Sequence, residues 1–180
     1  MNYVSILNYG SKILKSKNIT SYKLDTELLL AKVLNKSREE ILTNLNSTLS
    51  EKDFYSFKKL LIRRKKKEPI AYIFRQKDFW KYKFFVNQDV LIPRPETEII
   101  IEEVLKLTSY NSSRLFLDVG TGSGCLILSI IKERPNSHGT AIDISKKAIN
   151  IAVNNAKMHH LENKIKFINI NVDKFNSDKY

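Results

Sequence analysis

The feature that most constrains the fold is a glycine-rich segment between two apolar runs, LFLDVGTGSGCLILSI at residues 115–130. The run before the glycines has the length of a short buried strand, and the run after them has that of a helix. Glycine reaches positive φ easily and places no Cβ between the main chain and a ligand. The order of strand, glycine turn and helix therefore predicts an α/β domain that holds a nucleotide-like cofactor.

The same alternation continues along the chain. GTAIDI predicts a second strand over 139–144, SKKAINIAVNNAKMHH a helix capped by Ser145, and KIKFINI a third strand over 164–170. Two successive βαβ units predict a parallel sheet with right-handed crossovers. The first strand is usually central in such sheets, so we expect it to be an unpaired edge in a chain with three strands.

The glycine spacing indicates the class of ligand. Gly120, Gly122 and Gly124 form G-x-G-x-G, which differs from the dinucleotide pattern G-x-G-x-x-G and lacks the Lys-Ser/Thr of a P-loop. This spacing after Asp118 favours S-adenosylmethionine, whose amino-acid end would meet Asp118 and backbone groups. Asp143 ends the second strand, about 20 residues on, where an acidic side chain accepts ribose hydroxyls. The alternative, a tight turn without a ligand, leaves the position of Asp143 unexplained.

The first part of the chain is expected to be helical. Apolar residues recur at helical spacing over 1–68, and Ser37 with Glu40 forms a capping box. The basic run RRKKKEP at 63–69 is expected to end a helix, because cations favour the C-terminal dipole and proline blocks continuation. We therefore predict a helical domain over 1–68 that packs or docks a partner.

Residues 69–92 are rich in aromatic and β-branched side chains and predict a β-hairpin linker, with strands near Ile70–Phe74 and Tyr82–Val86. Prolines on both sides of Arg94 force an extended turn. Pro95 then begins a helix with Ile99–Leu107 as its buried body. The third part, 93–180, holds the glycine turn.

Composition sets weaker limits. The net charge of +12 admits a nucleic-acid partner. Lysine is common and arginine scarce, however, and we expect most of these charges to lie on solvent-exposed faces rather than in a nucleic-acid site. Cys125 is the only cysteine and is expected to be a buried apolar residue, and no Cys/His spacing indicates a metal. His138, His159 and His160 carry no motif. Without a signal peptide or membrane-spanning run, we expect a cytoplasmic protein.

Three segments together resemble the HemK/PrmC family of release factor glutamine methyltransferases: LIPRPETE, LDVGTGSG and AIDIS. The resemblance implies a helical bundle followed by a Rossmann-like methyltransferase sheet, and methyl transfer from S-adenosylmethionine to the glutamine amide in the Gly-Gly-Gln motif of peptide chain release factors. It implies cofactor binding by Asp118, Gly120, Thr121, Gly122, Ser123, Gly124, Asp143, Asn171 and Val172. It also implies a substrate pocket lined by Arg94, Pro95, Glu96 and Glu98.

The chain departs from the family's pattern in three places. Val172 lacks the flat ring that would stack on adenine, and Arg75 stands where the family usually has glycine. The Asn-Pro-Pro-Tyr segment that orients the reacting amide does not occur, which leaves the catalytic residues unknown. A sheet truncated after its third strand is expected to bind the cofactor weakly and to be inactive alone. Two other hypotheses are an adenine-amino methyltransferase acting on nucleic acid and a non-catalytic remnant or docking module.

Overall fold

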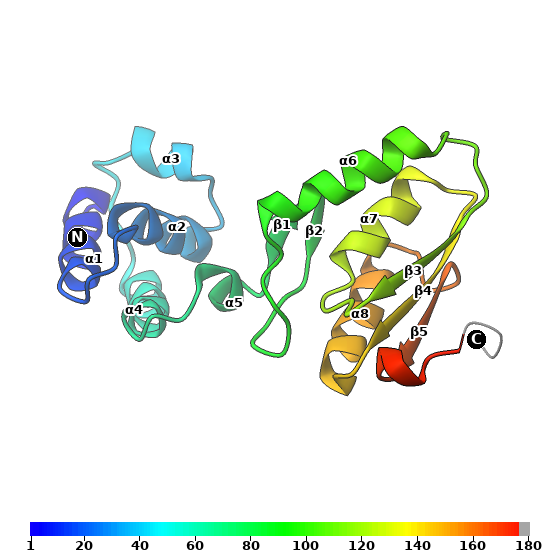
Figure 1. Ribbon diagram of the computed structural model, residues 1–180. Coiled ribbons are helices and arrows are strands. Elements are labelled where there is room, and N and C mark those ends of the chain that lie inside the picture. The colour runs from blue at the N-terminus through cyan, green and yellow to red at the C-terminus, as the bar shows by residue number, and fades with distance from the viewer. Residues whose placement is uncertain (177–180) are drawn as a thin grey trace. The chain divides into compact units, whose positions relative to one another are not determined.

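The computed structural model describes residues 1–176 and divides into two compact units, Met1–Phe74 and Arg75–Tyr180. The first unit is helical and the second contains the sheets (Figure 1). The predicted division into 1–68, a linker over 69–92 and a domain over 93–180 stays a prediction, since the compact units divide at Phe74 and Arg75. Among the described residues, no helix is both long enough and apolar enough to cross a membrane.

The helical unit consists of five helices, namely α1 (Tyr3–Lys15), α2 (Tyr22–Leu34), α3 (Arg38–Thr43), α4 (Glu51–Lys65) and α5 (Ile70–Phe74). The capping box of Ser37 and Glu40 is present at the start of α3, and Ser50 caps α4 through the backbone N–H of Asp53. These side chains bind N–H groups that have no partner within the helix. The starts of α3 and α4 are thus fixed by side chains that lie within three residues of the groups they bind.

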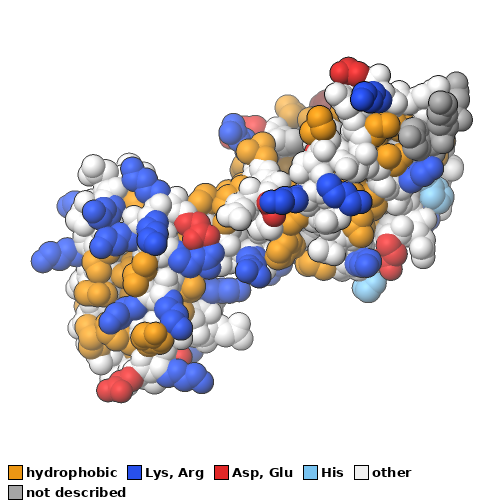
Figure 2. All heavy atoms as spheres, turned by 90° about the horizontal axis from the view of Figure 1, so that it is seen from below, with side chains coloured by type: hydrophobic (Ala, Val, Ile, Leu, Met, Phe, Trp, Pro, Cys, Tyr) orange, Lys and Arg blue, Asp and Glu red, His pale blue; other side chains and the backbone are white. Residues whose placement is uncertain are grey.

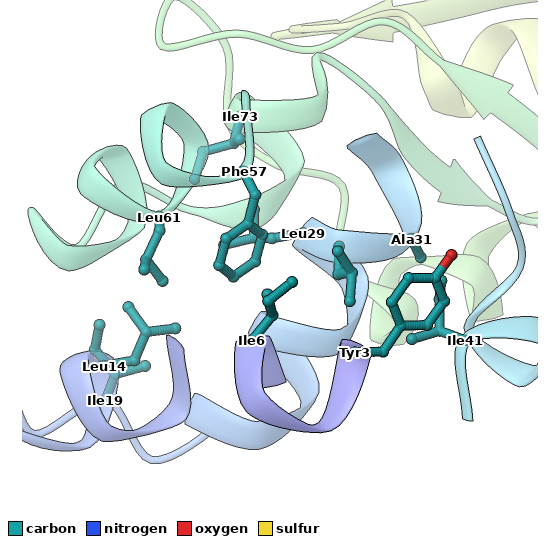
Figure 3. Close-up of a cluster of buried hydrophobic side chains, with 11 residues drawn as sticks. Tyr3, Ile6, Leu14, Ile19, Leu29, Ala31, Ile41, Phe57, Leu61 and Ile73 are labelled. Carbon is teal, nitrogen blue, oxygen red and sulfur yellow. The ribbon is translucent and has the colours of Figure 1, made fainter. Parts of the chain in front are cut away.

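A single apolar cluster holds these helices together (Figure 3). Phe57 and Leu61 of α4 pack against Ile6 and Leu14 of α1 and against Leu29 of α2. The basic run ends α4 as predicted. Both of its arginines form ion pairs within this unit. They are Arg63 with Glu68 and Arg64 with Asp25.

The prediction of a strand at Ile70–Phe74 is wrong, because these residues form α5. The carbonyl of Pro69 accepts the N–H groups of Tyr72 and Ile73, and Ile73 packs into the helical core. A five-residue apolar run is compatible with either state, and here the core selects the helix. The hairpin instead pairs β1 (Lys77–Phe79) with β2 (Tyr82–Phe84), so the second predicted strand begins at Tyr82 and ends two residues early.

The predicted parallel sheet is confirmed in the second unit. Its strands are β3 (Leu115–Val119), β4 (His138–Asp143) and β5 (Ile165–Asn169), in the order β3-β4-β5. The crossovers are α7 (Cys125–Glu133) and α8 (Lys146–Met158), which pack on the sheet, and a short 3-10 helix, η2 (Val172–Lys174), follows β5. β3 lies at an edge, and its Leu115 is 88% exposed.

The segment after the hairpin starts with the 3-10 helix η1 (Pro95–Thr97) and continues as α6 (Glu98–Leu107). The prediction that Ile99–Leu107 is a buried body is wrong for several residues, since Ile99 is 59% and Leu107 82% exposed. α6 packs mainly on α7, so one stripe at helical spacing faces inward. That stripe consists of Ile101, Val104 and Leu105.

Candidate functional site

The glycine turn between β3 and α7 uses all three of its glycines in the left-handed region. The φ angles are +74° at Gly120, +55° at Gly122 and +79° at Gly124. A Cβ on Gly124 would lie 3.0 Å from Leu128 Cδ1 and 3.2 Å from Ala152 Cβ, so this glycine lets α7 approach α8. A Cβ on Gly120 would meet no atom within 4 Å, so the space above this residue is open to a ligand.

Asp143 at the end of β4 holds the turn from the other side. Its Oδ2 accepts the N–H of Gly122 at 2.9 Å, and its Oδ1 accepts the N–H of Ser145 at 2.8 Å. The carbonyl of Ile142 accepts the N–H groups of Gly120 and Thr121. Parallel pairing of β3 with β4 therefore brings the glycine turn and the carboxylate together at the carboxyl ends of the strands.

Asp118 lies in β3, just before the turn. Thr121 Oγ1 donates a hydrogen bond to Asp118 Oδ2 at 2.7 Å. Burial raises the pKa of Asp118, and the nearby Asp143 carboxylate acts in the same direction, while the bond from Thr121 opposes them. A positively charged group beside Asp118 would favour its ionised form.

Two pockets meet at Gly120. One, of about 210 Å³, lies over the ends of β3 and β4 and is lined by Val119, Gly120, Ile142, Asp143, Ile144, Ile170, Asn171 and Val172. The other, of about 190 Å³, is lined by Leu91, Ile92, Pro93, Arg94, Thr97, Asp118, Gly120, Thr121, Gly122, Ser123, Cys125 and Leu126. Each pocket contains one of the two carboxylates that the sequence indicated.

The first pocket also contains the segment after β5. Asn171 caps η2, with its Oδ1 accepting the N–H of Asp173 at 3.1 Å. That bond leaves the Nδ2 group of Asn171 as the donor available to a ligand. Val172 offers an aliphatic side chain to the same pocket.

The four residues expected to form a substrate pocket are placed differently from one another. Arg94 lines the second pocket, whereas Pro95, Glu96 and Glu98 are absent from its lining. Glu98 Oε1 instead accepts the backbone N–H of Trp80 at 2.8 Å, which ties α6 to the hairpin. Among the described residues, the structure therefore brings Arg94 alone of this set to the glycine turn.

Sequence reasoning missed several residues at this site. Asn155 of α8 is fully buried and hydrogen bonded to both the glycine turn and the hairpin end. Its Nδ2 donates to the carbonyls of Ser123 and Phe85, and its Oδ1 accepts the N–H of Phe85. The sequence did contain a signal for this residue. The asparagine interrupts an apolar helical stripe, which consists of Ala148, Ile151, Ala152 and Ala156.

Cys125 also lies at the site. It is half-buried and lines the second pocket, and burial raises the pKa of its thiol to about 11. The thiol therefore stays protonated at neutral pH and lines the pocket as a small apolar group.

Two family models match this chain: the PrmC N-terminal domain over residues 5–74 and a methyltransferase domain over residues 110–180. The chain is 39% identical over 194 positions to a bifunctional methyltransferase of Rickettsia typhi, covering 97% of this chain and 38% of that protein. It is 40% identical over 154 positions to the release factor glutamine methyltransferase of Leptospira interrogans, covering 85% and 54%.

The chain thus spans between 38% and 54% of the length of these two relatives. Among solved structures, it resembles a SAM-dependent methyltransferase from Thiobacillus denitrificans in complex with S-adenosyl-L-homocysteine. That likeness has a TM-score of 0.40 and 25% identity, and it covers 47% of this chain and 33% of the other.

Proposed function

Since this chain belongs to the HemK/PrmC family, we propose that it forms the cofactor-binding part of a release factor glutamine methyltransferase. The reaction we assign to the whole enzyme is methyl transfer from S-adenosylmethionine to the glutamine side-chain amide in the Gly-Gly-Gln motif. The observation that carries the proposal is the pair of pockets that meet at Gly120, each with its own carboxylate. A two-ended cofactor without phosphate suits two such pockets.

The residues of the first pocket fit the adenosine end. A carboxylate has about four acceptor positions, and Asp143 uses one on each oxygen for Gly122 and Ser145. Those two bonds hold the carboxylate still and leave acceptor capacity for the ribose hydroxyls. Asn171 would donate to adenine through Nδ2, and Val172 would contact one face of the base without stacking on it.

The second pocket fits the amino-acid end. Asp118 would bind the amino group, which stabilises the carboxylate against the burial that raises its pKa. Thr121 fixes the orientation of this carboxylate, and the open space above Gly120 lets a ligand lie against the main chain. When bound, S-adenosylmethionine supplies an electrophilic methyl group on a sulfonium centre.

On the substrate side, Arg94 is the basic residue that reaches the second pocket. The apolar part of the pocket lining beside it consists of Leu91, Ile92 and Pro93. These side chains would exclude water from a neutral amide side chain bound there. Pro95, Glu96 and Glu98 would act by holding this segment, as Glu98 does through Trp80. An amide nitrogen is a poor nucleophile, so positioning by such groups is what the reaction needs most.

The helical domain, residues 1–68, would serve to dock the release factor, and the reaction would take place in the cytoplasm. The family model over 5–74 supports a separate N-terminal domain in this part of the chain. The methyl-transfer step itself is assigned to the whole enzyme, because the 180 residues contain no Asn-Pro-Pro-Tyr segment.

Calorimetry with S-adenosylmethionine tests the cofactor site. Gly120→Ala puts a methyl group into the open space between the pockets and is expected to weaken binding at least about tenfold, equivalent to about 1.4 kcal/mol. Asp143→Asn is expected to weaken binding as well, whereas Asp173→Asn, the same change on an exposed carboxylate nearby, should not. Equal affinity of all three variants for S-adenosylmethionine would show that the cofactor does not bind at this site.

A second experiment tests the substrate. A purified release factor and its Gly-Gly-Ala variant are each mixed with the chain and tritiated S-adenosylmethionine, and binding and labelling are both measured. Tighter binding or labelling of the natural motif supports the proposal. Equal binding of both proteins, or labelling of added RNA or DNA instead, would overturn the assigned substrate.

A further inference from the structure

A surface groove of about 120 Å³ lies between α1 and α4 of the helical unit. Four apolar side chains and two lysines line it, namely Tyr9, Ile13, Lys58, Leu61, Ile62 and Lys65. Tyr9 is 39% and Ile62 52% exposed, whereas Leu61 at the base is buried. An apolar cavity of about 150 Å³ holds a benzene ring, so this groove has room for one large apolar side chain.

The spacing of the lining residues suits a helical occupant. Lys58, Leu61, Ile62 and Lys65 follow one another at positions i, i+3, i+4 and i+7, so they form one stripe along α4. Tyr9 and Ile13 do the same at i and i+4 on α1. Two neighbouring helices with an apolar seam form a groove into which the side chains of a third helix pack.

The charge around the groove has one sign. α1 contains no Asp or Glu, and α4 contains none after Asp53. Residues 1–74 hold 15 Lys and Arg but only 7 Asp and Glu. Figure 2 shows a face of the helical unit on which Lys and Arg side chains surround hydrophobic ones, with few acidic side chains between them.

The arginines and lysines of α4 differ in what they contact. Arg63 and Arg64 are already engaged by carboxylates of the same unit. Among residues 1–176, no carboxylate forms an ion pair with Lys58 or Lys65. Lys58 instead extends over the ring of Phe54, with its Nζ 5.4 Å from the centroid. The ammonium groups of these two lysines line the groove and are therefore available to an external partner.

We propose that the α1–α4 groove docks an acidic amphipathic helix of a protein partner. An apolar side chain of that helix would fill the groove over Leu61, and its flanking Asp and Glu would meet Lys58 and Lys65. The inference deepens the docking role proposed above for the helical domain by naming the chemistry of the segment it would bind, and its test depends on this surface alone. A protein helix is favoured over RNA because the floor is largely aliphatic, and its one aromatic ring, that of Tyr9, contacts Phe54 at 6.0 Å.

The test measures anisotropy of a fluorescein-labelled helical peptide with Leu at i, i+3, i+4 and i+7 and Glu at the flanking positions. The full chain is expected to bind it and to release it as salt is raised. Lys58→Glu with Lys65→Glu should weaken binding about tenfold, since each lost ion pair and each new repulsion contributes. Ile62→Ser should weaken it by removing apolar contact.

Two controls make the result specific. Lys23→Glu changes the same charge at an exposed position of α2 and should leave the affinity unchanged. A peptide with Lys in place of Glu should bind the doubly reversed variant better than it binds the natural chain. Circular dichroism confirms that each variant is folded.

Three results would overturn the proposal. One is no binding of the acidic peptide at low salt. Another is binding that the double reversal does not change. The third is tighter binding of a labelled single-stranded RNA that the same reversal abolishes, which would make this surface a nucleic-acid site.

Discussion

Replacing Asn155 by alanine is expected to destabilise the second unit more than any other single change at an asparagine of α8. The side chain is 0% exposed and makes three hydrogen bonds, of 2.7, 2.8 and 2.9 Å. A net contribution of about 1 kcal/mol for each bond gives a loss of about 3 kcal/mol. Since small domains are stable by about 5–15 kcal/mol, this loss is a large fraction of the total.

Urea unfolding followed by tryptophan fluorescence measures this loss. Trp80 is the only tryptophan and lies in the second unit, where its Nε1 donates to Glu133 at 2.9 Å. Its emission therefore reports the unfolding of that unit. The adjacent Asn154 is exposed and provides a matched control, because Asn154→Ala makes the same change in the same helix.

The control is expected to leave the free energy of unfolding unchanged or slightly higher, since alanine favours a helix more than asparagine does. Asn155→Ala should also weaken binding of S-adenosylmethionine, because Ser123 of the glycine turn loses its fixed partner. If the two variants unfold within about 1 kcal/mol of each other, the three bonds contribute less than the usual amount, and the reasoning is refuted.

Three further predictions concern charge and backbone. Burial and a neighbouring lysine lower the pKa of His159 in the folded chain. As the pH falls, the unfolded chain therefore binds a proton at this residue before the folded chain does, and the second unit should lose stability below a pH of about 6.5. His159→Gln should flatten this part of the stability profile measured by tryptophan fluorescence. Arg64→Met should destabilise the helical unit by about 2 kcal/mol in far-ultraviolet circular dichroism, because Asp25 is buried beside it, whereas the more exposed Arg38→Met should cost under about 1 kcal/mol. Arg75 has φ of +55°, so Arg75→Gly should raise the melting temperature by relieving about 1 kcal/mol of strain, and a lower melting temperature would contradict this.

The parts of the fold that follow from short stretches of sequence were predictable. The cap at Ser145 is present, with its Oγ accepting the N–H of Ala148, and the alternation after residue 115 gives the parallel sheet. The glycines of the turn adopt the positive φ that their spacing suggested. These features depend on neighbours in the chain, which the sequence displays directly.

The features that were mispredicted or missed depend on distant contacts. Ile73 joins the helical core, which makes its segment a helix although its composition suits a strand. Ile99 is exposed because α6 packs mainly on one neighbour. Asn155 reaches Phe85, 70 positions away, and no local pattern specifies that pair. The glycine turn and the two carboxylates beside it were therefore predictable from the sequence, and the buried groups that hold them were less so.

The strand order β3-β4-β5 bears on how the chain folds while it is being made. β4 and β5 each pair with the strand synthesised just before them, so this sheet grows in the direction of translation. The helical unit, residues 1–74, is complete before β3 begins to emerge at a rate of about 5–20 residues per second. Pairing between sequential strands also keeps contacts short in sequence, which favours rapid folding. Each crossover helix can thus be buried once the strand that follows it has been synthesised, since α7 packs on β4 and α8 on β5.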